Sequence, residues 1–207
     1  MEQVLDVYKR PYDIANPVVC MDESPKQLIE ETRVPIKMKP GHLAKYDYEY
    51  RRHGVANIFI ASEPLISKRI VKITKTKKKA DWAQFMKEIS DQYPQAKRIT
   101  IVMDNYGTHK IGSFYEVFTP EIAKMLIDRF EFVYTPKHGS WLNMAEIELN
   151  IIQGQCFNRR IKDISMMRRE AKAWMKHRNS KKCKINWQFT AEDARIKLRR
   201  LYPSIEA

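Results

Sequence analysis

The run from Ile99 to Met103, with the sequence ITIVM, constrains the fold more than any other segment of the chain. Its side chains do not alternate between apolar and polar as those of a half-buried strand would. Strands with a continuous apolar run of this kind are buried on both faces and occur in sheets that helices cover from both sides. Asp104 and Asn105 follow directly. The chain is therefore predicted to form an α/β fold with a carboxylate at the end of a buried strand.

Four other segments are typical of strands. Val18–Met21 is a short apolar run that ends at Asp22, and two β-branched runs at 55–61 and 67–74 are predicted to form an antiparallel pair beside it. Phe132–Tyr134 is the last strand. Helical spacing and capping signals predict helices at 80–93, 111–118, 120–129 and 165–178, one that begins with Ser140 as its N-cap, and one that begins with Thr190 and has Asp193 at the capping-box position.

Three antiparallel strands followed by parallel strands and helices predict a mixed five-stranded sheet with helices on both faces, an RNase H-like arrangement. We expect an irregular leader at 1–16, an RNase H-like domain at 17–157, and a basic helical extension at 158–207 that packs on it.

Positive charge is concentrated toward the C-terminus. The formal net charge is +13, and residues 1–156 carry 23 Lys and Arg against 20 Asp and Glu, whereas residues 157–207 carry 15 against 5. A basic segment on a nearly neutral body indicates a polyanionic partner, with nucleic acid as the first candidate. The alternative is a basic face that only aids solubility.

Neither a membrane segment nor a secretory signal is evident. No apolar run approaches the roughly 20 residues of a membrane helix, and the first residues are mixed and charged. Cys20, Cys156 and Cys183 are isolated, which is typical of a reducing cytosol and argues against a zinc cluster or a disulfide framework. We expect a cytoplasmic protein without a membrane partner.

Two of the predicted strands end in carboxylates, Asp22 and Asp104, and Glu146 lies on the helix after the last strand. In this topology the first and fourth strands are neighbours, so the two aspartates should lie side by side. Two charges about 4 Å apart repel by about 4 kcal/mol at an effective dielectric constant near 20. Such a site must hold a proton or cations, and oxygen ligands select Mg²⁺ or Mn²⁺. Two such ions suit phosphoryl transfer. Taken singly, each aspartate is more often a turn residue or a helix cap.

Glu146 and Glu148 compete for the third position. Glu148 is about 200° further round the helix, so the two cannot share a site. Glu146 has Asn143 and Asn150 on its face, and Glu148 is left to solvent or to a structural pairing. Glu23 points to the opposite side of its strand from Asp22 if the strand persists.

These residues stand in motifs that resemble the catalytic part of the DDE transposases of the mariner-like superfamily, in particular the bacterial insertion-sequence group numbered six-thirty. The matching segments are VVCMDESPKQL around Asp22, YDYEY at 46–50, IVMDNYGTH around Asp104, YTPKHGSWLNMAEIEL around Glu146, and NWQFTAEDARIKLRRLYPS at 186–204. The resemblance implies an RNase H-like fold and two Mg²⁺ ions, for which Mn²⁺ substitutes. It also implies cleavage of double-stranded DNA at the ends of a mobile element and joining of the freed 3′-hydroxyl to target DNA, usually at a TA step. Asp22, Asp104 and Glu146 would be the catalytic, metal-binding triad of a homodimer that acts on DNA at the bacterial nucleoid.

Several other residues are candidates for supporting roles. Asn105 and His109 follow the second aspartate as in the family and are expected to orient a phosphate or water; the alternative for His109 is a loop histidine packed on the sheet. Asn143 is a supporting residue beside Glu146, and Trp141 is expected in the core, with a stacking role as the alternative. Candidate DNA contacts are Lys137 and His138 ahead of the Glu146 helix, Lys77 and Lys78 after the third strand (otherwise a solvated strand end), and Arg195 and Arg199 near the C-terminus.

One departure from the family concerns recognition of the element ends. Family members carry helix-turn-helix modules ahead of the catalytic domain, whereas this sequence starts some 20 residues before Asp22. We therefore expect a catalytic fragment, the second frame of a two-frame element or a decayed copy, with a separate helix-turn-helix polypeptide as a possible partner. The alternatives to a transposase are an RNase H-like nuclease that does not transpose and an inactive DNA-binding remnant.

Overall fold

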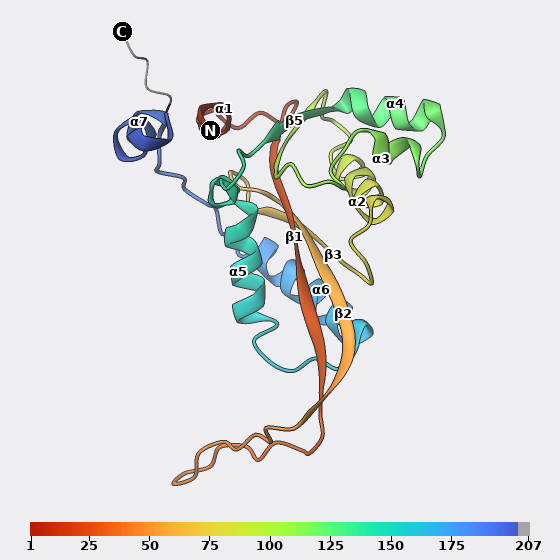
Figure 1. The fold of residues 1–207 in the computed structure, drawn as a ribbon, viewed down its shortest axis with the longest axis vertical. Coiled ribbons are helices and arrows are strands. Elements are labelled where there is room, and N and C mark those ends of the chain that lie inside the picture. The colour runs from red at the N-terminus through yellow and green to blue at the C-terminus, as the bar shows by residue number, and fades with distance from the viewer. Residues whose placement is uncertain (203–207) are drawn as a thin grey trace.

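The computed structural model describes residues 1–202; Pro203 and Ser204, which end the last of the family-like motifs, lie outside them. A five-stranded sheet with the order β3-β2-β1-β4-β5 forms the centre of the molecule (Figure 1). β1 pairs antiparallel with β2 and parallel with β4, so the first and fourth strands are neighbours as predicted. The sheet is the expected mixed, RNase H-like one. Its strands are β1 (Val18–Glu31), β2 (Tyr50–Glu63), β3 (Lys68–Thr74), β4 (Ile99–Met103) and β5 (Phe130–Tyr134).

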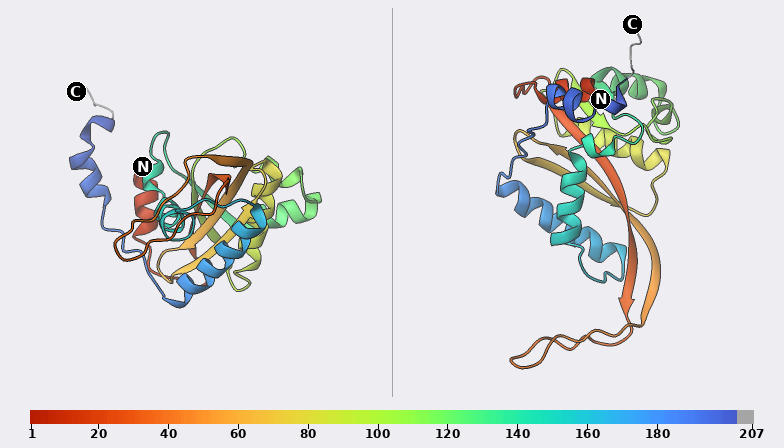
Figure 2. Two further views of the ribbon diagram at one scale, coloured as in Figure 1. Left: turned by 90° about the horizontal axis from the view of Figure 1, so that it is seen from below. Right: turned by 60° about the vertical axis from the view of Figure 1, so that its left-hand side comes forward.

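Helices cover both faces of the sheet (Figure 2). Alternate residues of β1 enter two separate cores: Val19 and Met21 pack with one cluster and Cys20 with the other, as the two-residue period of a strand requires. The first cluster includes residues of α2 (Lys79–Asp91), α3 (Gly112–Tyr115) and α4 (Pro120–Arg129). The second includes residues of α1 (Glu2–Tyr8), α5 (Ala145–Gln155), α6 (Ile164–Ser180) and α7 (Ala191–Lys197).

β1 is much longer than the predicted strand at 18–21, because it continues past Asp22 to Glu31. Its pairing with β4 stops at Cys20, but β2 accompanies it from Cys20 to Glu31. Pro25 is tolerated inside β1 because this part of the strand pairs only with β2 and is an edge on its other side. A missing N–H costs little on an edge that has no partner strand. The prediction that the strand ends at Asp22 was therefore wrong, although the parallel part of the sheet does end there.

The segment at 32–49 projects from the end of the β1–β2 pair as a long arm (Figure 1). Two isolated bridges join its sides, Ile36 with Lys45 and Lys39 with His42. The arm exposes large apolar side chains: Val34 is 91% exposed, Leu43 81% and Tyr48 85%. Arg160 holds its base through a hydrogen bond of 3.0 Å to the Asp47 carbonyl.

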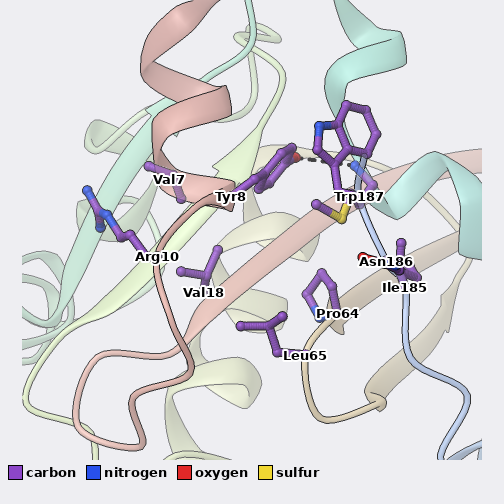
Figure 3. A pocket seen from close by; sticks show the side chains of 10 residues that line it. Val7, Tyr8, Arg10, Val18, Pro64, Leu65, Ile185, Asn186 and Trp187 are labelled. Carbon is purple, nitrogen blue, oxygen red and sulfur yellow. Dashed lines mark hydrogen bonds between the residues drawn. The ribbon is translucent and has the colours of Figure 1, made fainter. Parts of the chain in front are cut away.

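Residues 1–16 are not the irregular leader that was expected. Glu2–Tyr8 form helix α1, and Val4, Leu5 and Val7 are buried in the core with Cys20. Figure 3 shows Tyr8 directed toward Trp187 of the C-terminal segment; their ring centroids are 5.2 Å apart. The N-terminal segment is thus part of the folded domain.

The long helix after β5 begins later than expected. Ser140–Leu142 form a 3-10 turn, η1, and α5 starts only at Ala145, so Ser140 does not cap it. Trp141 is 45% exposed and packs edge-on against Phe189, which corrects the expectation of a core position. The predicted cap of the last helix is confirmed, since Thr190 and Asp193 form a capping box.

Of the remaining helices, all but one differ little from expectation. α4 begins with Pro120 as predicted, whereas the helix expected at 111–118 is reduced to the single turn of α3. None of the helices within residues 1–202 has the length and apolar character needed to cross a membrane.

Candidate active site

The pairing of β1 with β4 places Asp22 beside Asp104. Val18 pairs with Thr100 and Cys20 with Val102, so the same register carried two residues further aligns the two aspartates. Neighbouring strands are about 4.8 Å apart. Asp104 directly follows the last residue of β4. Asp22 comes two residues after Cys20, the last residue of β1 that pairs with β4, so its side chain is on the same face of the sheet as that of Cys20. The two carboxylates therefore meet where the parallel part of the sheet ends.

Asn143 connects the third carboxylate to the same place. Its side-chain amide donates a hydrogen bond of 2.8 Å to the carbonyl of Met21, the residue before Asp22. Its side-chain oxygen accepts one of 3.1 Å from the amide of Ala145, the first residue of α5. Asn143 is buried and both polar atoms bind the backbone, so it joins the start of α5 to β1 and does not face a phosphate. Glu146, half-buried in the first turn of α5, is held near Asp22 by this contact.

The Asp22 carboxyl is affected by the charges of the neighbouring carboxylates. Burial, together with the smaller effect of the negative charges of Glu23, Asp104 and Glu146, raises the pKa of Asp22 to about 7, despite a hydrogen bond from the Glu23 amide that lowers it. An anionic cluster with this property favours binding of a proton or a cation.

His109 is buried beneath Asp104 and contacts it from the interior of the protein. Its Nδ1 is 2.6 Å from Asp104 Oδ1, and its Nε2 is 3.1 Å from Glu23 Oε2. The ring is buried and stacks on Trp82 at 5.7 Å between centroids. These contacts support a packed histidine that orients Asp104, and they leave it no access to a phosphate or water in the groove.

The two carboxylates beside His109, those of Asp104 and Glu23, favour the protonated form of its imidazole. Burial alone would lower the pKa of His109, but the hydrogen bond to Asp104 and the contact with Glu23 raise it to about 9. Burial likewise opposes ionisation of Asp104, yet His109 lowers the pKa of Asp104 below its usual value. His109 Nε2 and Glu23 Oε2 meet at ion-pair distance without hydrogen-bond geometry and have no other partner among residues 1–202.

Glu23 is the residue that sequence reasoning missed. Its side chain is only 4% exposed and points away from Asp22, as expected for the next residue of a continuing strand. The adjacent acidic residues Asp22 and Glu23 were visible in the sequence, but His109, the residue that Glu23 contacts, is on a loop 86 residues later. Lys77 also approaches it, with Nζ 3.9 Å from Glu23 Oε1 and 4.8 Å from the centre of the Tyr106 ring.

An open groove lies beside Asp104. Lys137 and His138 are exposed along it, and His138 has a left-handed backbone with φ of 63°. Asn105 is exposed in the same groove and accepts a hydrogen bond of 2.5 Å from Lys110. The residues that line the groove are Asp104, Asn105, Tyr106, Thr135, Pro136, Lys137, His138 and Ser140.

The other predicted DNA contacts are not part of this groove. The Lys78 amide donates to the Asp81 carboxylate at the start of α2. Arg195 forms an ion pair of 2.7 Å with Glu2 of α1. Arg199 is exposed on the following 3-10 turn, η2 (Arg199–Leu201).

Glu148 is fully buried on the other side of α5 from Glu146. It forms ion pairs with Arg69 at 2.7 Å and Arg178 at 2.8 Å. Burial opposes its ionisation, but the two arginines lower the pKa of Glu148 below its usual value. The sequence left Glu148 either to solvent or to a structural pairing, and the structure shows the pairing.

The triad residues fit a hard cation by chemistry, though they are not arranged as a finished metal site. All three residues are carboxylates, the ligands that Mg²⁺ and Mn²⁺ prefer, and the charges of Asp104 and Glu146 add to the effect of burial in raising the pKa of Asp22. Within residues 1–202, no three His, Cys, Asp or Glu side chains are close enough together to form a ready metal cluster.

Comparison with known proteins shows the family and the fold of the chain. The family model described as DDE superfamily endonuclease matches residues 17–168, whereas no curated protein matches the chain. Among solved structures, the Mos1 mariner paired end complex with Mn has a TM-score of 0.58 at 15% identity, over 88% of this chain and 56% of that one. The Mos1 strand transfer complex has a TM-score of 0.56 at 16% identity, over 84% and 51%.

These structural likenesses show a shared fold, and the chain spans little more than half the length of the Mos1 proteins. The family match is of a different kind because it extends over most of the sequence and includes Asp22, Asp104 and Glu146. On that basis the chain belongs to the DDE superfamily endonucleases.

Proposed function

We propose that this chain is the catalytic part of a transposase that cuts DNA phosphodiester bonds at the ends of a mobile element and joins the freed 3′-hydroxyl to target DNA. The observation that carries the proposal is the alignment of Asp22 with Asp104 at the end of the parallel strands, with Glu146 attached to the same strand through Asn143. In this proposal the three carboxylates are the catalytic residues.

Two Mg²⁺ ions, or Mn²⁺ in their place, are the cofactor that this donor set fits. When bound, such ions activate the attacking oxygen and stabilise the leaving one. The chain itself supplies ligands from β1, from the end of β4 and from α5. His109 and Glu23 hold Asp104 from behind, and Asn143 holds the α5 end against β1. A Mos1 paired end complex with Mg, similar in fold at 15% identity and a TM-score of 0.52, supports this choice.

Double-stranded DNA is the proposed substrate, both as element ends and as a target with a TA step. The groove beside Asp104 carries Lys137 and His138 at its edge and Lys77 is close to the carboxylates, so cations are available for phosphate contacts on either side. Arg199 and Lys78 remain candidates for contacts outside the groove. Arg195 would first have to leave Glu2.

The proposed acting form is a homodimer on DNA. The arm at 32–49 supports it, because large apolar side chains on a projecting segment are typical of a surface that another chain covers. We further propose membership of the bacterial six-thirty insertion-sequence group, action at the nucleoid, and recognition of the element ends by a separate helix-turn-helix polypeptide.

Nicking of supercoiled plasmid in Mg²⁺ or Mn²⁺ tests the active site. Asp104→Ala should lose about 100-fold or more in nicking rate, since a metal ligand is removed and even changes in groups that orient such ligands typically cost about 10- to 100-fold, and EDTA should stop the wild-type reaction. Asp128→Ala is the matched control, because Asp128 is an exposed aspartate whose ion pair within residues 1–202 is with Lys124 on α4. Equal nicking by Asp104→Ala and wild type would show that the triad is assigned wrongly.

Strand-transfer assays on element-end DNA separate the transposase from a nuclease of the same fold. Joined products are expected only from a transposase. If wild-type protein nicks DNA but never joins it, a nuclease that does not transpose becomes the better description. DNA binding without any nicking or metal binding would instead favour an inactive remnant.

A further inference from the structure

The hydroxyl group of Tyr8, the last residue of α1, is hydrogen-bonded to the backbone just ahead of α5. The Tyr8 hydroxyl donates a hydrogen bond of 2.7 Å to the Leu142 carbonyl and accepts one of 3.4 Å from the Met144 amide. The Cys20 thiol also donates to it, at 3.6 Å. A phenolic hydroxyl has one proton to donate and two lone pairs, so these three contacts use its full capacity.

Residues 142–144, just before the proposed catalytic glutamate, are all held by hydrogen bonds. Leu142 and Met144 are bound to Tyr8, and Asn143 between them is bound to the Met21 carbonyl. Glu146 is two residues after Met144. The link from η1 to α5 is therefore fixed to β1 on one side and to α1 on the other.

The Tyr8 ring is itself held in place from the C-terminal side of the chain. Figure 3 shows it between α1 and Trp187, whose indole N–H donates to the Phe189 carbonyl at 2.7 Å. Ion pairs of Lys9 with Glu192 and of Arg195 with Glu2 join α1 to α7. Both segments are outside residues 17–168, the part that the family model matches.

We propose that Tyr8 is a positioning residue for Glu146, so that the N-terminal helix sets the distance between the glutamate and the two aspartates. Tyr8 touches neither metal nor DNA and acts through the backbone of residues 142–144. This inference rests on the proposed function, because it assumes that Glu146 binds a metal ion.

Tyr8→Phe is the test, since it removes the hydroxyl and keeps the ring that packs on Trp187. Tyr202→Phe is the matched control, because the Tyr202 hydroxyl also binds α1, through Glu2 at 3.0 Å, but does not contact α5. Mn²⁺ binding is measured by titration calorimetry and nicking by its dependence on Mn²⁺ concentration. Tyr8→Phe should bind Mn²⁺ roughly tenfold more weakly, as changes in groups that orient metal ligands typically do, and its nicking should be rescued at high Mn²⁺. Tyr202→Phe should match wild type.

Amide hydrogen exchange provides a readout without metal or activity. Residues 142–146 should exchange faster in Tyr8→Phe than in wild type or Tyr202→Phe, while β4 keeps its protection and thereby shows that the variant is folded. Unchanged exchange in this segment, or unchanged Mn²⁺ affinity, overturns the role of Tyr8 and leaves the proposed function intact. A wild-type protein that binds no Mn²⁺ overturns the proposed function and this inference with it.

Discussion

His109 Nδ1 is 2.6 Å from Asp104 Oδ1, and the same imidazole contacts Glu23 with its other nitrogen at 3.1 Å. Glu23 and Asp22 are adjacent in β1 and point to opposite faces of the sheet. One face of the strand thus carries a proposed metal ligand, and the other carries the group that, through His109, holds a second ligand in place. The loop after β4 is thereby attached to β1.

His109→Ala should therefore reduce nicking although His109 has no access to the DNA. The Asp104 carboxylate would lose the group that orients it, and changes of this kind typically cost about 10- to 100-fold in metal affinity or activity. The rate is measured under single-turnover conditions at several Mn²⁺ concentrations. His53→Ala is the control, because it removes a similar contact, 2.8 Å to Glu30, far from the groove. A fully active His109→Ala variant would leave only the packing role.

Glu148→Gln should destabilise the fold strongly. Glu148 and Arg69 are both at least 99% buried, and removing one member of a buried ion pair leaves an uncompensated charge. Such changes typically cost about 3–5 kcal/mol in the free energy of unfolding, which urea denaturation measures. Asp128→Asn breaks an exposed pair with Lys124 and should cost less than about 1 kcal/mol. Similar losses in the two variants would contradict the buried network.

The comparison of sequence and structure shows which features local patterns can predict. β4 was predicted to the residue, because an apolar run between polar residues carries its own boundaries. The extension of β1 from Asp22 onward was missed because it depends on pairing with β2, whose partner residues are up to 38 positions away. Helix α1 was missed because a helix of 7 residues is marginal by itself and forms only where its apolar side chains are buried by distant segments.

The same reason explains the errors at the site. Asp22, Asp104 and Glu146 were predicted from strand ends and helix phase, and their catalytic role remains a prediction. The position of His109 depends on Glu23, and that of Trp141 depends on Phe189, 48 residues later. Contacts of that kind are made by the fold and leave no periodic signal. The boundary between a domain at 17–157 and an extension after it also remains a prediction, and α6 buries Met167 and Ala171 in the same core as α5.

Glu131 should make stability depend on pH in the acid range. Hydrogen bonds from Arg10 and Thr100 lower the pKa of Glu131 in the folded protein, despite partial burial. A lowered folded pKa means that the stabilisation is complete above the unfolded pKa of about 4.3 and is lost as pH falls through the folded value. Glu131→Gln should thus be less stable than wild type at pH 7, by less than about 1 kcal/mol because the pair is partly exposed. The difference, measured by urea denaturation from pH 7 to pH 2.5, should vanish at the acid end; a difference that grows toward low pH would contradict the ion pair.

Lys137→Ala tests whether the groove beside Asp104 holds a DNA backbone. Lys137 is exposed at its edge, and a lysine that contacts a phosphate releases a counterion when DNA binds. Removing it should weaken binding to unrelated duplexes by a similar factor and reduce the slope of log affinity against log salt concentration by about 1. Fluorescence anisotropy at four or more salt concentrations measures that slope. Lys124→Ala removes an exposed lysine paired with Asp128 on α4 and should leave the slope unchanged. Because both variants lose one positive charge, a slope that falls equally in both would mean that net charge, and not the groove, determines DNA binding.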